Sequence, residues 1–168
     1  MGLKAGLKKV IESTPLLAIP TRLCREELKF FLCKQRQTPY GFSISGNHLM
    51  ETGQFEPFEC AAISHLFKKT DVFIDIGANI GFYSCLARSE GKKVIAIEPL
   101  LSNIRWLRWN IKKNDWKDIE IFPIALAEKS GKGILFGYNT GASLIKGWAG
   151  QSSMHKQAVS QSTLDALL

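Results

Sequence analysis

Apolar residues in the middle of the chain form short continuous runs that alternate with spaced repeats. The runs at 72–76 and 94–98 are typical of parallel strands that are buried on both faces. Spaced apolar positions predict helices over 82–89 and 101–113, and residues 119–122 predict a third strand. This alternation predicts an α/β fold with a parallel sheet, whose right-handed connections place the three strands in the spatial order 3-2-1.

The N-terminal part of the chain has a different pattern. Residues 2–12 place apolar side chains on one helical face with lysines opposite, and a second helical stretch is predicted over about 21–35. Prolines at positions 15 and 20 separate the two stretches. We therefore predict an N-terminal helical segment over residues 1–40, followed by one domain over residues 41–168.

The segments that flank the alternating core have weaker patterns. A short hairpin is predicted from 41–45 and 48–51, and apolar spacing predicts a helix over 57–68. After residue 127, glycines interrupt polar stretches, and residues 134–136 and 158–160 are the strand candidates there.

Composition is that of an ordinary globular protein. The 168 residues are 45% hydrophobic and 22% charged, which argues against disorder. No apolar run approaches the roughly 20 residues that span a bilayer, and the N-terminus lacks the apolar core and cleavage site of a secretory signal. We therefore expect a soluble, cytoplasmic protein without a transmembrane segment.

The charge and the cysteines exclude little by themselves. The net charge is +7, densest in the N-terminal segment, and such a face can attract nucleic acid, anionic lipid or an acidic substrate. No arginine-rich run accompanies it, so we interpret it as a solvated surface and expect no nucleic-acid partner. The four cysteines show neither Cys-x-x-Cys pairs nor histidines at metal-ligand spacing, so we predict no disulfide and no metal.

A glycine-bracketed turn follows the first predicted strand. Residues 77–81 read Gly-Ala-Asn-Ile-Gly and lead directly into the helix predicted over 82–89. In a doubly wound sheet, ligands bind outside the carboxyl ends of the strands, where the chain order reverses. Glycines allow the backbone to approach a ligand closely, and a helix N-terminus attracts anions. The turn is therefore a candidate site for a carboxylate or a phosphate.

Two acidic residues decide which ligand suits this turn. Asp75 lies just before it, where a negative charge would disfavour the pyrophosphate of a dinucleotide, and the glycine spacing differs from the dinucleotide fingerprint. The methionyl end of S-adenosylmethionine offers an ammonium for Asp75 and a carboxylate for the turn amides. Glu98 ends the second strand, where a carboxylate can accept hydrogen bonds from both ribose hydroxyls. We therefore expect S-adenosylmethionine as cofactor.

Each of these residues also has a purely structural interpretation. Asp75 can cap a turn, the glycines at 77 and 81 can serve the turn alone, and Glu98 can be the polar end of a strand before Pro99. Their occurrence together in one strand–helix–strand unit favours the cofactor interpretation.

The same residues carry a family resemblance. Residues 71–81, Asp-Val-Phe-Ile-Asp-Ile-Gly-Ala-Asn-Ile-Gly, followed by Ile-Glu-Pro at 97–99, resemble the FkbM-like family of S-adenosylmethionine-dependent methyltransferases. The resemblance covers about residues 50–168. Its further elements are Gly-Gln-Phe-Glu-Pro at 53–57, Asn110 and Asn114, Ile-Ala-Leu at 124–126 and Thr-Leu-Asp at 163–165.

The resemblance implies a Rossmann-like class I methyltransferase sheet and O-methylation of a hydroxyl on a small-molecule or glycan acceptor such as a sugar or natural product. By the same resemblance, Glu56 helps to shape the site and Ala125 lies near adenine. The implied cofactor-binding residues are Asp75, Gly77, Ala78, Asn79, Gly81 and Glu98. In the family, a further strand with an Asp-x-Glu-Gly element follows Thr-Leu-Asp, whereas this sequence ends at Leu168. We therefore expect a sheet that is incomplete on that side, with an exposed apolar edge that favours self-association.

The expected reaction is attack by a substrate oxygen on the sulfonium methyl group, for which a hydroxyl needs a base. The histidines at 48, 65 and 155 have no motif context, so the catalytic residues stay unassigned. Two other functions remain open. An RNA methyltransferase is suggested by the basic charge and by Arg-Trp-Leu-Arg-Trp at 105–109, although the tryptophans of such a helix more often pack in the core. The other is a truncated, non-catalytic domain that binds the cofactor.

Overall fold

A computed structural model of the chain describes residues 27–137, 141–148 and 155–167. The chain divides into two compact units, Met1–Lys34 and Gln35–Leu168. In the first unit, residues 27–32 are helical, whereas the helix expected over 2–12 lies outside the described residues. The second unit begins before the boundary expected at residue 40, because β1 (Arg36–Gln37) pairs antiparallel with β2 (Ser43–Ile44).

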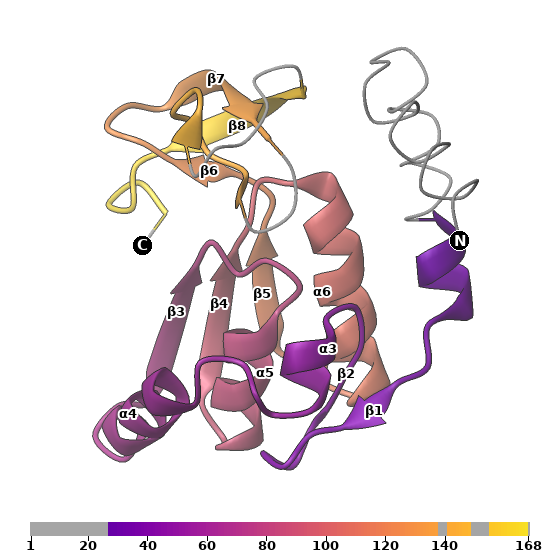
Figure 1. Cartoon of the computed structure of the whole chain (residues 1–168). Coiled ribbons are helices and arrows are strands. Elements are labelled where there is room, and N and C mark those ends of the chain that lie inside the picture. The colour runs from indigo at the N-terminus through magenta and orange to yellow at the C-terminus, as the bar shows by residue number, and fades with distance from the viewer. Residues whose placement is uncertain (1–26, 138–140, 149–154, 168) are drawn as a thin grey trace, which may run out of the picture. The chain divides into compact units, whose positions relative to one another are not determined.

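The second unit is a mixed α/β structure built on a three-stranded parallel sheet. Its strands are β3 (Val72–Ile76), β4 (Lys93–Ile97) and β5 (Ile119–Phe122), in the spatial order β3-β4-β5. The strand order expected from the sequence is therefore confirmed. The helices α5 (Phe82–Ser89) and α6 (Leu101–Lys113) lie on one side of this sheet (Figure 1) and have the expected bounds.

The side chains of the sheet alternate between its two faces. Ala96, Ile119 and Ile121 belong to the face that packs against Leu107 and Ile111 of α6. On the opposite face of the edge strand β3, Val72 and Ile76 remain 47% and 57% exposed. Among the described residues β3 pairs only with β4, so the expected apolar edge is present. Self-association through this edge stays a prediction.

A second sheet covers the carboxyl ends of the first (Figure 1). It has the order β6-β8-β7, where β6 is Ala125–Leu126, β7 is Gly131–Phe136 and β8 is Lys156–Ser162. Strand β8 runs parallel to β6 and antiparallel to β7. Both weak strand candidates of the sequence lie within this sheet. Ala125, Leu135 and Val159 of this sheet form a small buried core together with Leu100, which lies near the tip of β4.

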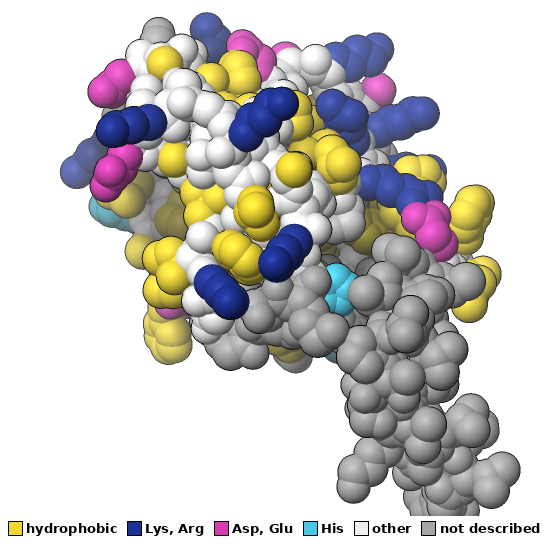
Figure 2. Space-filling model, turned by 90° about the horizontal axis from the view of Figure 1, so that it is seen from above, with side chains coloured by type: hydrophobic (Ala, Val, Ile, Leu, Met, Phe, Trp, Pro, Cys, Tyr) yellow, Lys and Arg dark blue, Asp and Glu magenta, His cyan; other side chains and the backbone are white. Residues whose placement is uncertain are grey.

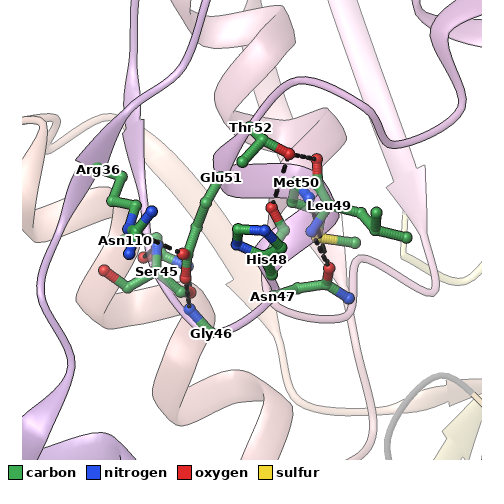
Figure 3. Close-up of polar contacts among 10 residues, drawn as sticks. All are labelled: Arg36, Ser45, Gly46, Asn47, His48, Leu49, Met50, Glu51, Thr52 and Asn110. Carbon is green, nitrogen blue, oxygen red and sulfur yellow. Dashed lines mark hydrogen bonds and ion pairs between the residues drawn. The ribbon is translucent and has the colours of Figure 1, made fainter.

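The hairpin expected from 41–45 and 48–51 is wrong in its second half. Residues 43–44 are a strand, but they pair with β1, and α3 (His48–Glu51) is a single helical turn (Figure 3). Asn47 starts this turn because its side-chain oxygen accepts hydrogen bonds from the amides of residues 49 and 50, at 3.0 and 3.4 Å. The carboxylate of Glu51, the last residue of this turn, accepts a hydrogen bond from Gly46 N at 3.0 Å and forms a salt bridge with Arg36 at 3.4 Å. The next helix, α4 (Pro57–Phe67), matches its expected range to within one residue.

Two asparagines, one in α6 and one directly after it, attach residues 43–45 to this helix. Asn110, completely buried, accepts from Ser45 N at 3.0 Å and donates to Ser45 O at 3.1 Å and to Ile80 O at 2.9 Å. Asn114 binds Ser43 in the same way, at 2.8 Å to its N–H and 2.7 Å to its carbonyl. An asparagine side chain thus supplies the donor and acceptor that a neighbouring strand would offer. Through Ile80, Asn110 also holds the turn between β3 and α5.

The described residues contain no helix that is both long and apolar enough to cross a bilayer. They also contain no group of three or more His, Cys, Asp or Glu side chains placed to hold a metal ion. The three cysteines in this part of the chain, at 33, 60 and 85, are free thiols. Cys85 is fully buried, and burial raises the pKa of its thiol.

Candidate binding site at the strand tips

A cavity of about 440 Å³ lies between the carboxyl ends of β3 and β4 and the second sheet. One wall of the cavity is polar and is formed by Gly77, Asn79, Glu98 and Asn103. The other is apolar except for Ser143 and is formed by residues 124–126, Leu135 and residues 142–145. This volume is within the usual range for small-molecule sites. The position also follows the rule for open α/β sheets, in which ligands bind outside the carboxyl ends of the strands.

The acidic side chain in this cavity is Glu98, which is only 5% exposed. One carboxylate oxygen accepts a hydrogen bond from Asn79 N at 2.7 Å, and the other accepts from Leu100 N at 2.8 Å. The side chain of Asn103 lies beside this carboxylate and favours its charged form. Burial raises the pKa of Glu98, while these donors act in the opposite direction. Glu98 therefore joins the turn after β3 to the start of α6.

The second predicted acid, Asp75, lies in β3 but does not line the cavity. It is buried, and its carboxylate accepts a hydrogen bond from Ser84 Oγ at 2.6 Å. Burial raises the pKa of Asp75, and the hydrogen bond from Ser84 opposes this shift. Its expected contact with a ligand ammonium stays a prediction.

Asp75 and Glu98 each contact the start of the helix that follows their strand. The sequence analysis considered a structural role of this kind only as an alternative to cofactor binding. Helix α5 begins after Gly81 and α6 after Leu100, and neither residue has a side chain that caps the helix. Instead, Asp75 accepts a hydrogen bond from Ser84 Oγ in the first turn of α5, and Glu98 accepts one from Leu100 N at the start of α6. Negative charge at a helix N-terminus is also favoured by the helix dipole. Only Glu98 additionally faces the cavity.

The turn at 77–81 uses most of its amides within the protein. Gly77 N and Ala78 N donate to Ile97 O at 2.8 and 3.0 Å, and Asn79 N donates to Glu98. Gly81 N donates to Ala78 O at 2.8 Å. A ligand carboxylate that bound these amides, as expected from the sequence, would compete with these bonds. Of the five turn residues, Gly77 and Asn79 line the cavity, whereas Ala78 and Gly81 are buried beside it.

The remaining predicted residues lie in two places. Ala125, 5% exposed in β6, lines the cavity. Glu56 does not; it has the left-handed backbone conformation, with φ of 44°, and accepts a hydrogen bond from the Tyr83 hydroxyl at 2.5 Å. None of the three histidines, His48, His65 and His155, lines the cavity.

Sequence reasoning missed Asn103 and the apolar wall at 142–145. Asn103 could have been found from helical periodicity, because it lies in the first turn of α6 on its buried face, with residues 107 and 110. The residues at 142–145 carry no comparable signal. They reach the cavity because Ser143 bridges Phe136 at the end of β7, a contact that only the fold creates.

The tryptophans of α6 have little surface for stacking on bases. Trp106 is 7% exposed, and two of its ring atoms lie 3.2 Å from the position that a Cβ would take at Gly46. The ring of Trp109 is partly buried and lies under Lys113 Nζ, which is 4.5 Å from the ring centroid. This packing favours the structural interpretation of both tryptophans.

The face above the second sheet is basic but mixed. Figure 2 shows dark-blue Lys and Arg side chains around this face, with yellow apolar side chains between them. Strands β7 and β8 contribute exposed Lys132 and Lys156 and contain no acidic residue. Interspersed lysines of this kind are typical of a solvated surface.

Fold and site together define an α/β protein with a polar and apolar cavity at the tips of its parallel strands. Searches against family models, curated proteins and solved structures found no match for the chain. Because a fold alone does not determine a function, the chemistry of this cavity decides what the protein can bind.

Proposed function

We propose that this chain binds S-adenosylmethionine in the strand-tip cavity and is a methyltransferase that resembles the FkbM-like family, with a Rossmann-like class I sheet. One observation carries the proposal: Glu98 directly follows β4 and lines a cavity that also includes Gly77 and Asn79 of the turn after β3. An acid in this place is suited to the hydroxyls of a nucleoside.

The two walls of the cavity suit the two parts of an adenosine group. Glu98 and Asn103 offer polar atoms for the ribose, while Ala125, Leu135 and Leu144 offer an apolar surface for the base. The methionyl end would extend toward Gly77 and Asn79 at the start of the turn. The volume of about 440 Å³ is adequate for a ligand of this size.

The reaction that we propose is O-methylation of a hydroxyl on a sugar or natural product. The acceptor oxygen attacks the sulfonium methyl group, the C–S bond breaks, and S-adenosylhomocysteine leaves as a neutral thioether. The hydroxyl proton passes to a base, and we assign that role to no described residue. Alignment of the two reactants is the main contribution of the protein, and it can supply about 7–11 kcal/mol of the barrier.

The first test is calorimetric titration with S-adenosylhomocysteine, the stable product, with NAD⁺ titrated in parallel. We expect micromolar binding of S-adenosylhomocysteine and much weaker binding of NAD⁺. Methyl transfer to a panel of hydroxylated acceptors then separates an enzyme from a domain that only binds the cofactor. Absence of any S-adenosylhomocysteine binding by the folded protein would remove the basis of the proposal.

The Glu98→Gln variant should bind S-adenosylhomocysteine at least about tenfold more weakly, because it loses charge-assisted hydrogen bonds to the ligand. Affinity in the wild type should also fall as the pH is lowered. Burial raises the pKa of Glu98, so protonation removes an acceptor at a higher pH than for an exposed glutamate. The loss should occur as the pH falls through this raised pKa and be absent in Glu98→Gln. A pH-independent affinity in the wild type would contradict this role.

A further inference from the structure

The free edge of strand β3 presents backbone groups at every second residue. β3 lies at the end of the three-stranded sheet (Figure 1), and among the described residues it pairs only with β4. Asp71 O accepts a hydrogen bond from Lys93 N at 3.0 Å, and Gly77 N donates to Ile97 O at 2.8 Å. Backbone groups point alternately to the two sides of a strand, so residues 71, 73, 75 and 77 direct theirs toward β4. The N–H and C=O groups that point to the free edge are those of Val72, Ile74 and Ile76.

The side chains of the same three residues are apolar and share one face of the sheet. Asp75 points to the face that α5 covers, where it is bonded to Ser84 of that helix. Val72, Ile74 and Ile76 therefore point to the opposite face, on which Val72 and Ile76 are exposed. An edge strand that combines free backbone groups with exposed β-branched side chains is a template for a further strand.

This arrangement is symmetric about Ile74. If a second copy of β3 runs antiparallel with Ile74 opposite itself, Val72 of each copy lies opposite Ile76 of the other. In each of these pairs the outward backbone groups face one another, so the two residues exchange both hydrogen bonds. On the open face, each β-branched side chain then packs against another one. A shift of the register by two residues would pair only two of the three positions within the strand.

We propose that two copies of this chain pair through β3 in this antiparallel register, with Ile74 on the two-fold axis. The three-stranded sheets of the two copies then form one continuous mixed sheet. A contact of this kind is self-complementary and closes on itself, as in most homodimers. Because a single pair of short strands buries little surface, the dimer is weak and depends on protein concentration. This pairing goes beyond the proposed function and does not require the cofactor.

Opposite charges at position 74 test both the dimer and its register. Sedimentation velocity of the whole chain over a concentration series should reach the mass of two chains. Ile74→Lys and Ile74→Glu should each stay monomeric, because identical charges would lie directly opposite one another. An equimolar mixture of the two variants should restore the dimer, since lysine then faces glutamate. Position 74 is chosen because Ile76 also lines the strand-tip cavity.

Proline at the same position separates pairing from folding. The N–H of Ile74 points away from β4, so Ile74→Pro removes a donor that a single chain does not use. The variant should fold, as circular dichroism and thermal unfolding show, and remain monomeric. Ile74→Ala is the matched control, because it also loses the side chain but keeps the N–H. It should still form a dimer, with lower affinity than the wild type.

Three results would each overturn the inference. The first is a wild type that stays monomeric at every concentration. The second is a dimer that forms equally well with Ile74→Pro, which would place the contact elsewhere on the molecule. The third is a mixture of folded Ile74→Lys and Ile74→Glu chains that stays monomeric, which would exclude the register centred on Ile74. The charge variants decide the question even if Ile74→Pro does not fold.

Discussion

Replacing Asn110 with leucine should lower the free energy of unfolding by about 3–5 kcal/mol. The change leaves three backbone groups without their partner, namely Ser45 N, Ser45 O and Ile80 O. Each buried polar group left unsatisfied costs about 1–3 kcal/mol. Asn110 and Ser45 are both completely buried, so water cannot easily take over these bonds. Urea unfolding followed by circular dichroism and tryptophan fluorescence measures the effect.

The neighbouring asparagine provides a graded control. Asn114 makes the same pair of bonds to Ser43, but both residues are only partly buried. Asn114→Leu should therefore cost less, about 1–2 kcal/mol, because water can reach the released groups. Lys112→Ala, on the exposed side of the same helix, should stay within about 0.5 kcal/mol. The attachment of β2 by Asn110 would be refuted if Asn110→Leu cost no more than Asn114→Leu.

The sequence was most informative where local physics dominates. Continuous apolar runs identified the strands of the parallel sheet, because a central parallel strand must be apolar on both faces. Spaced apolar positions identified both covering helices. The same reasoning failed at 48–51, where the cap at Asn47 produces a helical turn. The side-chain oxygen of Asn47 accepts hydrogen bonds from two backbone amides, and these bonds decide the local structure where the apolar pattern is ambiguous.

The candidate site was less predictable than the fold. Glu98, Gly77, Asn79 and Ala125 line the cavity, and each is at or near a strand end that the pattern had located. Asp75 was chosen by the same pattern, but alternation along β3 directs it toward α5 and Ser84. The strand pattern alone could not decide this, because it does not show which face the helix covers. The wall at 142–145 depends on a long-range bridge to β7 and has no local signal.

The turn that begins α5 should tolerate alanine at one glycine and not at the other. Both glycines have positive φ, +78° at Gly77 and +91° at Gly81. A Cβ at Gly77 would have no atom within 4 Å, whereas a Cβ at Gly81 would lie 2.4 Å from the Cδ1 of Leu107. Leu107 is completely buried in the core between α6 and the sheet and cannot move aside freely.

Gly81→Ala should therefore lower the free energy of unfolding by about 3 kcal/mol, from the left-handed backbone together with overpacking. Gly77→Ala should cost only the backbone part, about 1–2 kcal/mol. The steric part can be isolated with Leu107→Ala, which removes the clashing carbon. In that background Gly81→Ala should cost no more than Gly77→Ala does in the wild type, since only the φ penalty remains. Equal losses of unfolding free energy for the two single variants would show that Leu107 does not constrain this turn. The close packing of α6 against the turn would then not be what holds the turn beside the cavity.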